Sequence, residues 1–220
     1  MHKKIEILLQ VKLVNHKMAD TVVKPKPKPK IVRNKGTGAG GANTNKNGKT
    51  FEEKTANKPR LLAAGFTEHK IPGSKGKFNT YLEKATETGS IIYLSQGALK
   101  AYFQWKFKLE LFRAPDEAYL IQNGTNYTLR ILEKKNQNVE GSVDTKLLSG
   151  PSFVREYELS LNDTFTVEYA FCLSSFLEAK YNSKTKKFEI LKMILQEANI
   201  PVFFGDQPDY FTKLDAWVYS

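Results

Sequence analysis

Two acidic residues and one lysine are the strongest candidates for a reactive site in this sequence. Asp116 follows Pro115 just before the apolar stretch AYLI, and Glu133 and Lys135 lie two residues apart in LRILEKKNQ. Residues two apart on a β-strand project from the same face of the sheet, so Glu133 and Lys135 would act together. Two carboxylates that converge beside an ammonium make a site for a hard divalent cation.

Two β-rich stretches must position these side chains. AYLIQN and YTLRILEKKNQ are separated by GTN, which is typical of a hairpin turn, and the hairpin would bring Asp116 close to Glu133. Gln137 would continue the face of Glu133, while Lys134 would point the other way. Glu117 competes with Asp116 as a ligand, because strand parity does not decide which of the two carboxylates points inward.

Structural roles compete with this interpretation. Glu133 and Lys135 alone could be a solvated pair on a sheet, and Asp116 alone a turn residue. A second Glu-x-Lys, Glu178 and Lys180, ends the apolar stretch TFTVEYAFCLSSF. It lacks a proline-led acidic residue and a hairpin, so it is the minor alternative.

A glycine-rich segment, GTGAGGANTNKNGKTFEEKT (36–55), ends like a nucleotide-binding P-loop at Gly48-Lys49-Thr50. A P-loop needs a glycine at position 43, which is asparagine here, and a buried strand before it. The preceding KPKPKPK cannot be such a strand, so nucleotide hydrolysis is not expected. The segment instead offers candidate contacts to DNA phosphates or base edges, namely Asn43, Thr44, Asn45, Lys46 and Lys49.

The elements from residue 51 onward predict an α/β fold. FEEKTANKPRLLAAGF (51–66) is typical of a helix interrupted at Pro59. Residues 67–110 look like a mainly helical insertion, followed by the hairpin, a helical stretch over 142–161 and a strand over 164–175. KKFEILKMILQEANI has helical periodicity, PVFFG is typical of a short buried strand, and YFTKLDAWV of a closing helix. This order predicts an α/β sandwich with a mixed central sheet.

The basic charge lies at one end of the chain. The sequence contains 34 Lys and Arg against 23 Asp and Glu, a net charge of +11. Residues 1–60 hold 15 basic and 4 acidic residues, so they carry the whole excess of +11. We expect residues 1–35 to be a disordered basic arm that attracts a polyanion such as nucleic acid, and residues 36–220 to form the folded domain. Met18 could serve as a start, which makes residues 1–17 optional.

The cysteine count and the hydropathy of the sequence indicate where the protein is located. The single cysteine, Cys172, allows no disulfide within the chain, which favours a cytoplasmic or nuclear location. The three histidines are scattered and no Cys/His cluster has zinc spacing. No apolar run is long enough for a membrane span, so we expect no membrane partner.

The Pro-Asp…Glu-x-Lys arrangement resembles the PD-(D/E)XK nuclease superfamily. PDEAY and ILEKKNQNVEGSVDTKL are similar to type II restriction endonucleases, and GAGGANTNKNGKTFEEKT is similar to endonucleases of large DNA viruses. The resemblance covers roughly residues 36–66 and 113–217, and the insertion at 67–110 has no assigned counterpart. A virus-encoded protein with a restriction-endonuclease-like α/β sandwich is therefore the expectation.

The resemblance implies hydrolysis of DNA phosphodiester bonds by a water activated by Mg²⁺. Asp116 and Glu133 would hold the ion, and Lys135 would orient the water and stabilise charge. Glu52 would match the glutamate of the family's first helix as an outer ligand, with Glu53 the weaker candidate, and Gln137 would be a polar residue of the active face. Such enzymes usually act as homodimers on double-stranded DNA.

Two other functions compete with a site-specific endonuclease. One is a structure-specific nuclease of DNA repair or recombination, which would share the chemistry. The other is a DNA-binding module without catalysis, and the presence of all three of Asp116, Glu133 and Lys135 argues against it.

Overall fold

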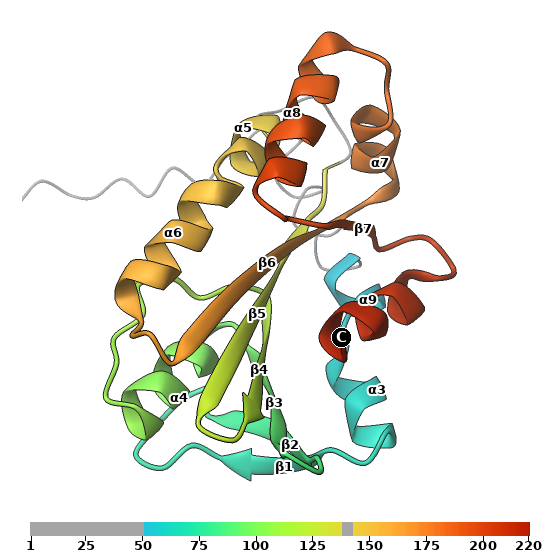
Figure 1. Cartoon of the computed structure of the whole chain (residues 1–220). Helices are drawn as coiled ribbons and strands as arrows, with labels where there is room; N and C mark the ends of the chain where they lie inside the picture. The colour runs from blue at the N-terminus through green and yellow to red at the C-terminus, as the bar shows by residue number, and fades with distance from the viewer. Residues whose placement is uncertain (1–50, 138–142) are drawn as a thin grey trace, which may run out of the picture. The chain divides into compact units, whose positions relative to one another are not determined.

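A seven-stranded mixed sheet forms the centre of the fold. The computed structural model describes residues 51–137 and 143–220 (Figure 1). The strands lie side by side in chain order, β1 to β7; β1 to β5 are antiparallel neighbours, and β6 and β7 continue parallel to β5. Their bounds are β1 Thr67–Lys70, β2 Thr80–Ala85, β3 Gly89–Ser95, β4 Glu117–Asn123, β5 Asn126–Lys135, β6 Phe165–Leu173 and β7 Val202–Phe204.

Helices cover both faces of the sheet. Residues 51–54 are helical, and the further helices are α3 Lys58–Ala63, α4 Gly97–Lys106, α5 Val143–Leu148, α6 Gly150–Ser160, α7 Ser175–Tyr181, α8 Lys186–Glu197 and α9 Tyr210–Val218. Figure 1 shows α4, α5, α6 and α8 on one side of the sheet and α3 and α9 on the other. We call these the α6 face and the α9 face. The predicted α/β sandwich with a mixed sheet is confirmed.

Alternation along the central strands divides the core between the two faces. On β5, Leu129 and Ile131 pack into the α6-face cluster, while Leu132 packs into the α9-face cluster. On β6, Tyr169 and Phe171 likewise belong to the α6 face. Because side chains of a strand point alternately to opposite faces, each residue's parity assigns its face.

Residues 67–110 correct the sequence-based expectation. They do not form a mainly helical insertion, because β1, β2 and β3 all belong to the central sheet and only α4 is helical. YLEKATE, expected as a helix, is largely β2, where Leu82 is buried and its neighbours are more exposed. Over six residues, the alternation typical of a strand and the periodicity typical of a helix are hard to distinguish. Pairing with β3 therefore determines that this segment is a strand.

The second Glu-x-Lys is also placed differently. Glu178 and Lys180 lie on α7 and not at the end of a strand, because β6 stops at Leu173. The carboxylate of Glu178 accepts hydrogen bonds from Gln207. The geometric premise of this minor alternative is therefore wrong.

Other expectations agree with the structure. The β4–β5 hairpin turns through Gly124, whose φ of 60° suits glycine, and Asn123 pairs with Asn126 across the turn. Tyr102 and Phe103 of α4 are buried in the core. Among the described residues, no helix is both long and apolar enough to cross a membrane. The basic arm (1–35) lies outside the described ranges.

Candidate functional site

The β4–β5 hairpin brings Asp116 beside Glu133. Glu117 pairs with Leu132 at the start of β4, so Asp116, one residue earlier, comes opposite Glu133. Asp116 Oδ2 accepts a hydrogen bond of 2.6 Å from the backbone N–H of Lys134. This bond fixes the carboxylate at the end of β5, on the same α6 face as Glu133.

The negative charge of Glu133 affects the pKa of Asp116. Burial, and next the charge of Glu133, raise the pKa of Asp116 to about 6, while the Lys134 N–H and the ammonium groups of Lys135 and Lys134 oppose the rise. Lys135 Nζ donates a hydrogen bond of 2.5 Å to Glu133 Oε1. The site therefore holds two neighbouring carboxylates with one ammonium beside them. The ammonium pairs with Glu133, so the charge of Asp116 is only partly compensated.

Glu117 and Lys134 form a separate cluster on the α9 face. Glu117 Oε1 accepts hydrogen bonds from Lys134 Nζ at 2.8 Å, Tyr93 Oη at 3.1 Å and the Asn57 N–H at 3.1 Å. Its second oxygen accepts one of 2.9 Å from Tyr119 Oη. We call Asn57, Tyr93, Glu117, Tyr119 and Lys134 the buried cluster.

The buried cluster decides between the two acidic residues that the sequence left open. Glu117 is only 3% exposed and both of its oxygens are used within the protein. Lys134 points away from Glu133, as the strand alternation predicted. Asp116 is thus the carboxylate that shares a face with Glu133.

The structure does not bring Glu52 to this pair. Phe51 packs into the α9-face core and so holds the 51–54 helix on the side opposite to Glu133. Glu52 and Glu53 are exposed. Across the described ranges, Glu52 has neither a hydrogen bond nor an ion pair, so it stays apart from Asp116 and Glu133.

The remaining candidates divide between the described and undescribed ranges. Gln137 follows β5 and its backbone N–H lies 3.4 Å from Ser174 Oγ, beside the start of α7. It lines a small cavity that also includes Lys180 and Lys187. The five candidate DNA contacts in the glycine-rich segment lie outside the described residues, namely Asn43, Thr44, Asn45, Lys46 and Lys49.

The donor set at Asp116 and Glu133 fits Mg²⁺. Each carboxylate uses one oxygen, for the Lys134 N–H and for Lys135 Nζ, and has no other hydrogen bond to the described residues. No group of three or more His, Cys, Asp or Glu able to hold a metal occurs within residues 51–137 and 143–220. Mg²⁺ typically takes one or two protein carboxylates and completes its octahedron with waters and substrate phosphates. Two carboxylates with free oxygens are therefore a sufficient protein contribution.

A cavity of about 250 Å³ opens beside Glu133. Tyr157 of α6 and Tyr169 of β6 line it together with Glu133, and both are 3% exposed. Burial, and next the charge of Glu133, raise the pKa of each tyrosine. Sequence reasoning missed these residues, because only the parallel pairing of β6 with β5 brings Tyr169, opposite Ile131, to the carboxylates.

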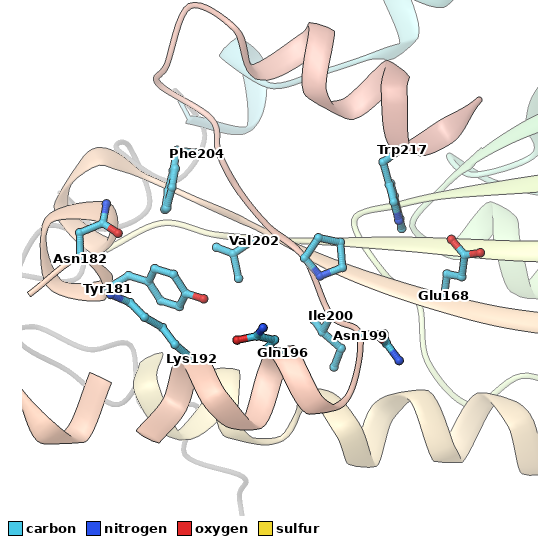
Figure 2. A pocket seen from close by; sticks show the side chains of 11 residues that line it. Glu168, Tyr181, Asn182, Lys192, Gln196, Asn199, Ile200, Val202, Phe204 and Trp217 are labelled. Atoms are coloured by element: carbon cyan, nitrogen blue, oxygen red, sulfur yellow. The ribbon is translucent and has the colours of Figure 1, made fainter. Parts of the chain in front are cut away.

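A larger hollow, about 870 Å³, lies elsewhere in the described residues and is an open groove (Figure 2). Figure 2 shows Tyr181, Lys192 and Gln196 on one side, Val202 of β7 at the base and Trp217 of α9 on the other. None of Asp116, Glu133 or Lys135 lines it. The candidate site is therefore marked by its titratable residues and not by the size of its cavity.

Comparison of this chain with models of protein families, with curated proteins and with solved structures found no match.

Proposed function

We propose that this protein is a Mg²⁺-dependent endonuclease that hydrolyses DNA phosphodiester bonds at specific sites, in the manner of type II restriction enzymes. The convergence of Asp116, Glu133 and Lys135 on one face of the sheet carries the proposal. Support also comes from the resemblance of the Pro-Asp…Glu-x-Lys residues to PD-(D/E)XK nucleases and from the charge of residues 1–60, which suits a polyanion.

Each residue of the set has a separate task. The free oxygens of Asp116 and Glu133 would ligate the ion, which lowers the pKa of a bound water and offsets the charge of the scissile phosphate. Lys135 is held by Glu133 through one of its N–H groups. Its other N–H groups are then available to orient the attacking water and to donate to the phosphate oxygen on which charge develops. Glu52 has no task in this arrangement, since it lies apart from the pair.

Digestion of plasmid DNA in Mg²⁺ tests the proposal. We expect the wild type to produce discrete fragments, and Glu133→Gln and Lys135→Ala to cleave about 10²- to 10⁴-fold more slowly, the range typical of a positioned catalytic group. Glu197→Gln is the matched control, because Glu197 is an exposed glutamate of α8 away from the site. It should cleave as the wild type does.

The products separate the competing functions. A smear of random lengths would favour the structure-specific nuclease over site-specific cleavage. Binding of DNA by the wild type with no cleavage in Mg²⁺ would contradict the endonuclease and favour the binding module. Cleavage that survives in both Glu133→Gln and Lys135→Ala would place the reaction elsewhere in the chain.

A further inference from the structure

The cavity beside Glu133 has aromatic walls. Phe153 lies on one side, and the guanidinium of Arg113 lies 4.3 Å from the centre of its ring. Phe112, at the mouth, is 67% exposed. An exposed phenylalanine at the entrance of a cavity leaves a large apolar surface in water, which a planar ligand would cover.

Two tyrosine hydroxyl groups face this cavity without a partner in the described parts of the protein. Tyr157 and Tyr169 are each 3% exposed as whole residues. Neither hydroxyl has a hydrogen-bond partner among the residues that the structure describes. Each hydroxyl is reachable from the cavity, where a ligand or water can form a hydrogen bond with it.

We propose that this cavity receives a nucleobase of the DNA strand, unstacked from its neighbours next to the scissile phosphate. The inference rests on the proposed nuclease function, because Glu133 is both a lining residue of the cavity and a member of the reactive set. The base would stack against the phenylalanine rings, and its polar edge would pair with Tyr157 and Tyr169, whose hydroxyls can donate or accept.

The character of the cavity favours a base over other occupants. A purely apolar ligand would leave the two tyrosine hydroxyls without hydrogen bonds. Water alone would satisfy them but would leave the exposed ring of Phe112 uncovered. A nucleobase combines a flat apolar face with donors and acceptors at its edge, and it arrives on the same strand as the phosphate that is cleaved.

Relative affinity for a bulged duplex tests this site. Two short labelled duplexes are titrated with protein, one fully paired and one with a single unpaired nucleotide. The buffer contains Ca²⁺, which takes the same oxygen ligands as Mg²⁺. Gels verify that the DNA stays intact. An unpaired base costs less to extrude. We expect the wild type to bind the bulged duplex about 10-fold more tightly, as one stacked base would give.

Three variants locate the effect. Phe112→Ala removes the ring at the mouth, and the double variant Tyr157→Phe with Tyr169→Phe removes only the two hydroxyls; both should bring the affinity ratio close to 1. Leu159→Ala is the matched control, because Leu159 is 69% exposed on α6 but does not line the cavity. It should keep the wild-type ratio, and thermal melting establishes that each variant is folded.

The outcomes distinguish this proposal from the nuclease itself. A wild-type ratio near 1, or a ratio unchanged in both cavity variants, overturns the base pocket, and Mg²⁺-dependent plasmid cleavage would then still support the nuclease. A ratio that depends on Phe112 and the hydroxyls supports the pocket even if the wild type cuts no plasmid, which would refute the nuclease alone.

Discussion

The β4–β5 hairpin carries an acid–lysine group on each of its two faces, and the two groups differ in how completely they are satisfied. On the α9 face, the side chains of Glu117 and Lys134 are 4% and 5% exposed; they bond to each other, and to Tyr93 and Thr55 respectively. On the α6 face, the Glu133 and Lys135 side chains are 24% and 16% exposed. Asp116 adds a second carboxylate there, and its pKa is raised to about 6.

Under the proposed function, this difference assigns stability to one face of the two strands and chemistry to the other. Glu117 and Lys134 bond to each other and, through Asn57 and Thr55, to the 51–57 segment, so the buried cluster is a structural feature that fixes this segment to the sheet. Two carboxylates kept close with one ammonium are electrostatically unfavourable in the free protein. Unfavourable electrostatic energy of this kind is typical of functional sites, where binding of a ligand relieves it.

Removing a lysine from each group should give the largest contrast. Lys134→Met leaves the Glu117 carboxylate buried without a counter-charge, and we expect a loss of about 3–5 kcal/mol in the free energy of unfolding. Lys135→Met breaks a pair that keeps partial access to water and should cost less, on the order of 1–2 kcal/mol. Urea unfolding measures both, and equal losses would remove the distinction between the two faces.

Asp116→Asn should stabilise the free protein by about 3 kcal/mol at pH 8, judging by the distance of the native pKa from that of an unfolded aspartate. The variant keeps an acceptor for the Lys134 N–H but removes the charge beside Glu133. Since the native pKa is raised, the carboxyl favours folding at pH below about 4 and this contribution is lost as the pH rises through 6.

The gain from Asp116→Asn should therefore fade between pH 8 and pH 4. Urea unfolding at these two pH values measures it, with Glu197→Gln as the control for loss of one negative charge. An Asp116→Asn variant that is destabilised at pH 8 would mean that the carboxylate is already neutralised by Lys135, and the α6 face would then resemble the buried cluster.

Mg²⁺ should stabilise the wild type by about 1.4 kcal/mol when its concentration is tenfold above the dissociation constant. The ion would bind the free oxygens of Asp116 and Glu133, so Asp116→Asn and Glu133→Gln should lose the effect while Glu197→Gln keeps it. Thermal unfolding with and without Mg²⁺ measures this without any cleavage assay. Equal stabilisation of all four proteins would indicate binding elsewhere.

The hairpin was accessible to sequence reasoning because its determinants are local. Alternating apolar residues, the glycine turn and the Glu-x-Lys spacing place Glu133 and Lys135 on one face and Lys134 on the other, and the structure agrees. The choice between Asp116 and Glu117 was not accessible, because it depends on Asn57 and Tyr93, which come from distant parts of the chain.

The missed features depend on contacts that are far apart in sequence. The segment 67–110 joins the sheet because β3 pairs with β4, and no local sequence pattern predicts this pairing. Tyr157 and Tyr169 approach Glu133 only once α6 has packed on β6, which in turn lies parallel to β5. Glu52 has the right position in the sequence order, but Phe51 fixes its helix on the opposite face.

The smallest contrast compares single hydroxyl groups on the two faces. Tyr93→Phe removes a donor to Glu117 Oε1, so it should cost about 1 kcal/mol in the free energy of unfolding. Tyr157→Phe removes a hydroxyl without a protein partner and should change that energy by less than about 0.5 kcal/mol. Urea unfolding of both variants would reveal whether the α6-face hydroxyl is dispensable for folding, as a ligand-binding group should be; a loss at Tyr157 equal to that at Tyr93 would instead make it part of the core.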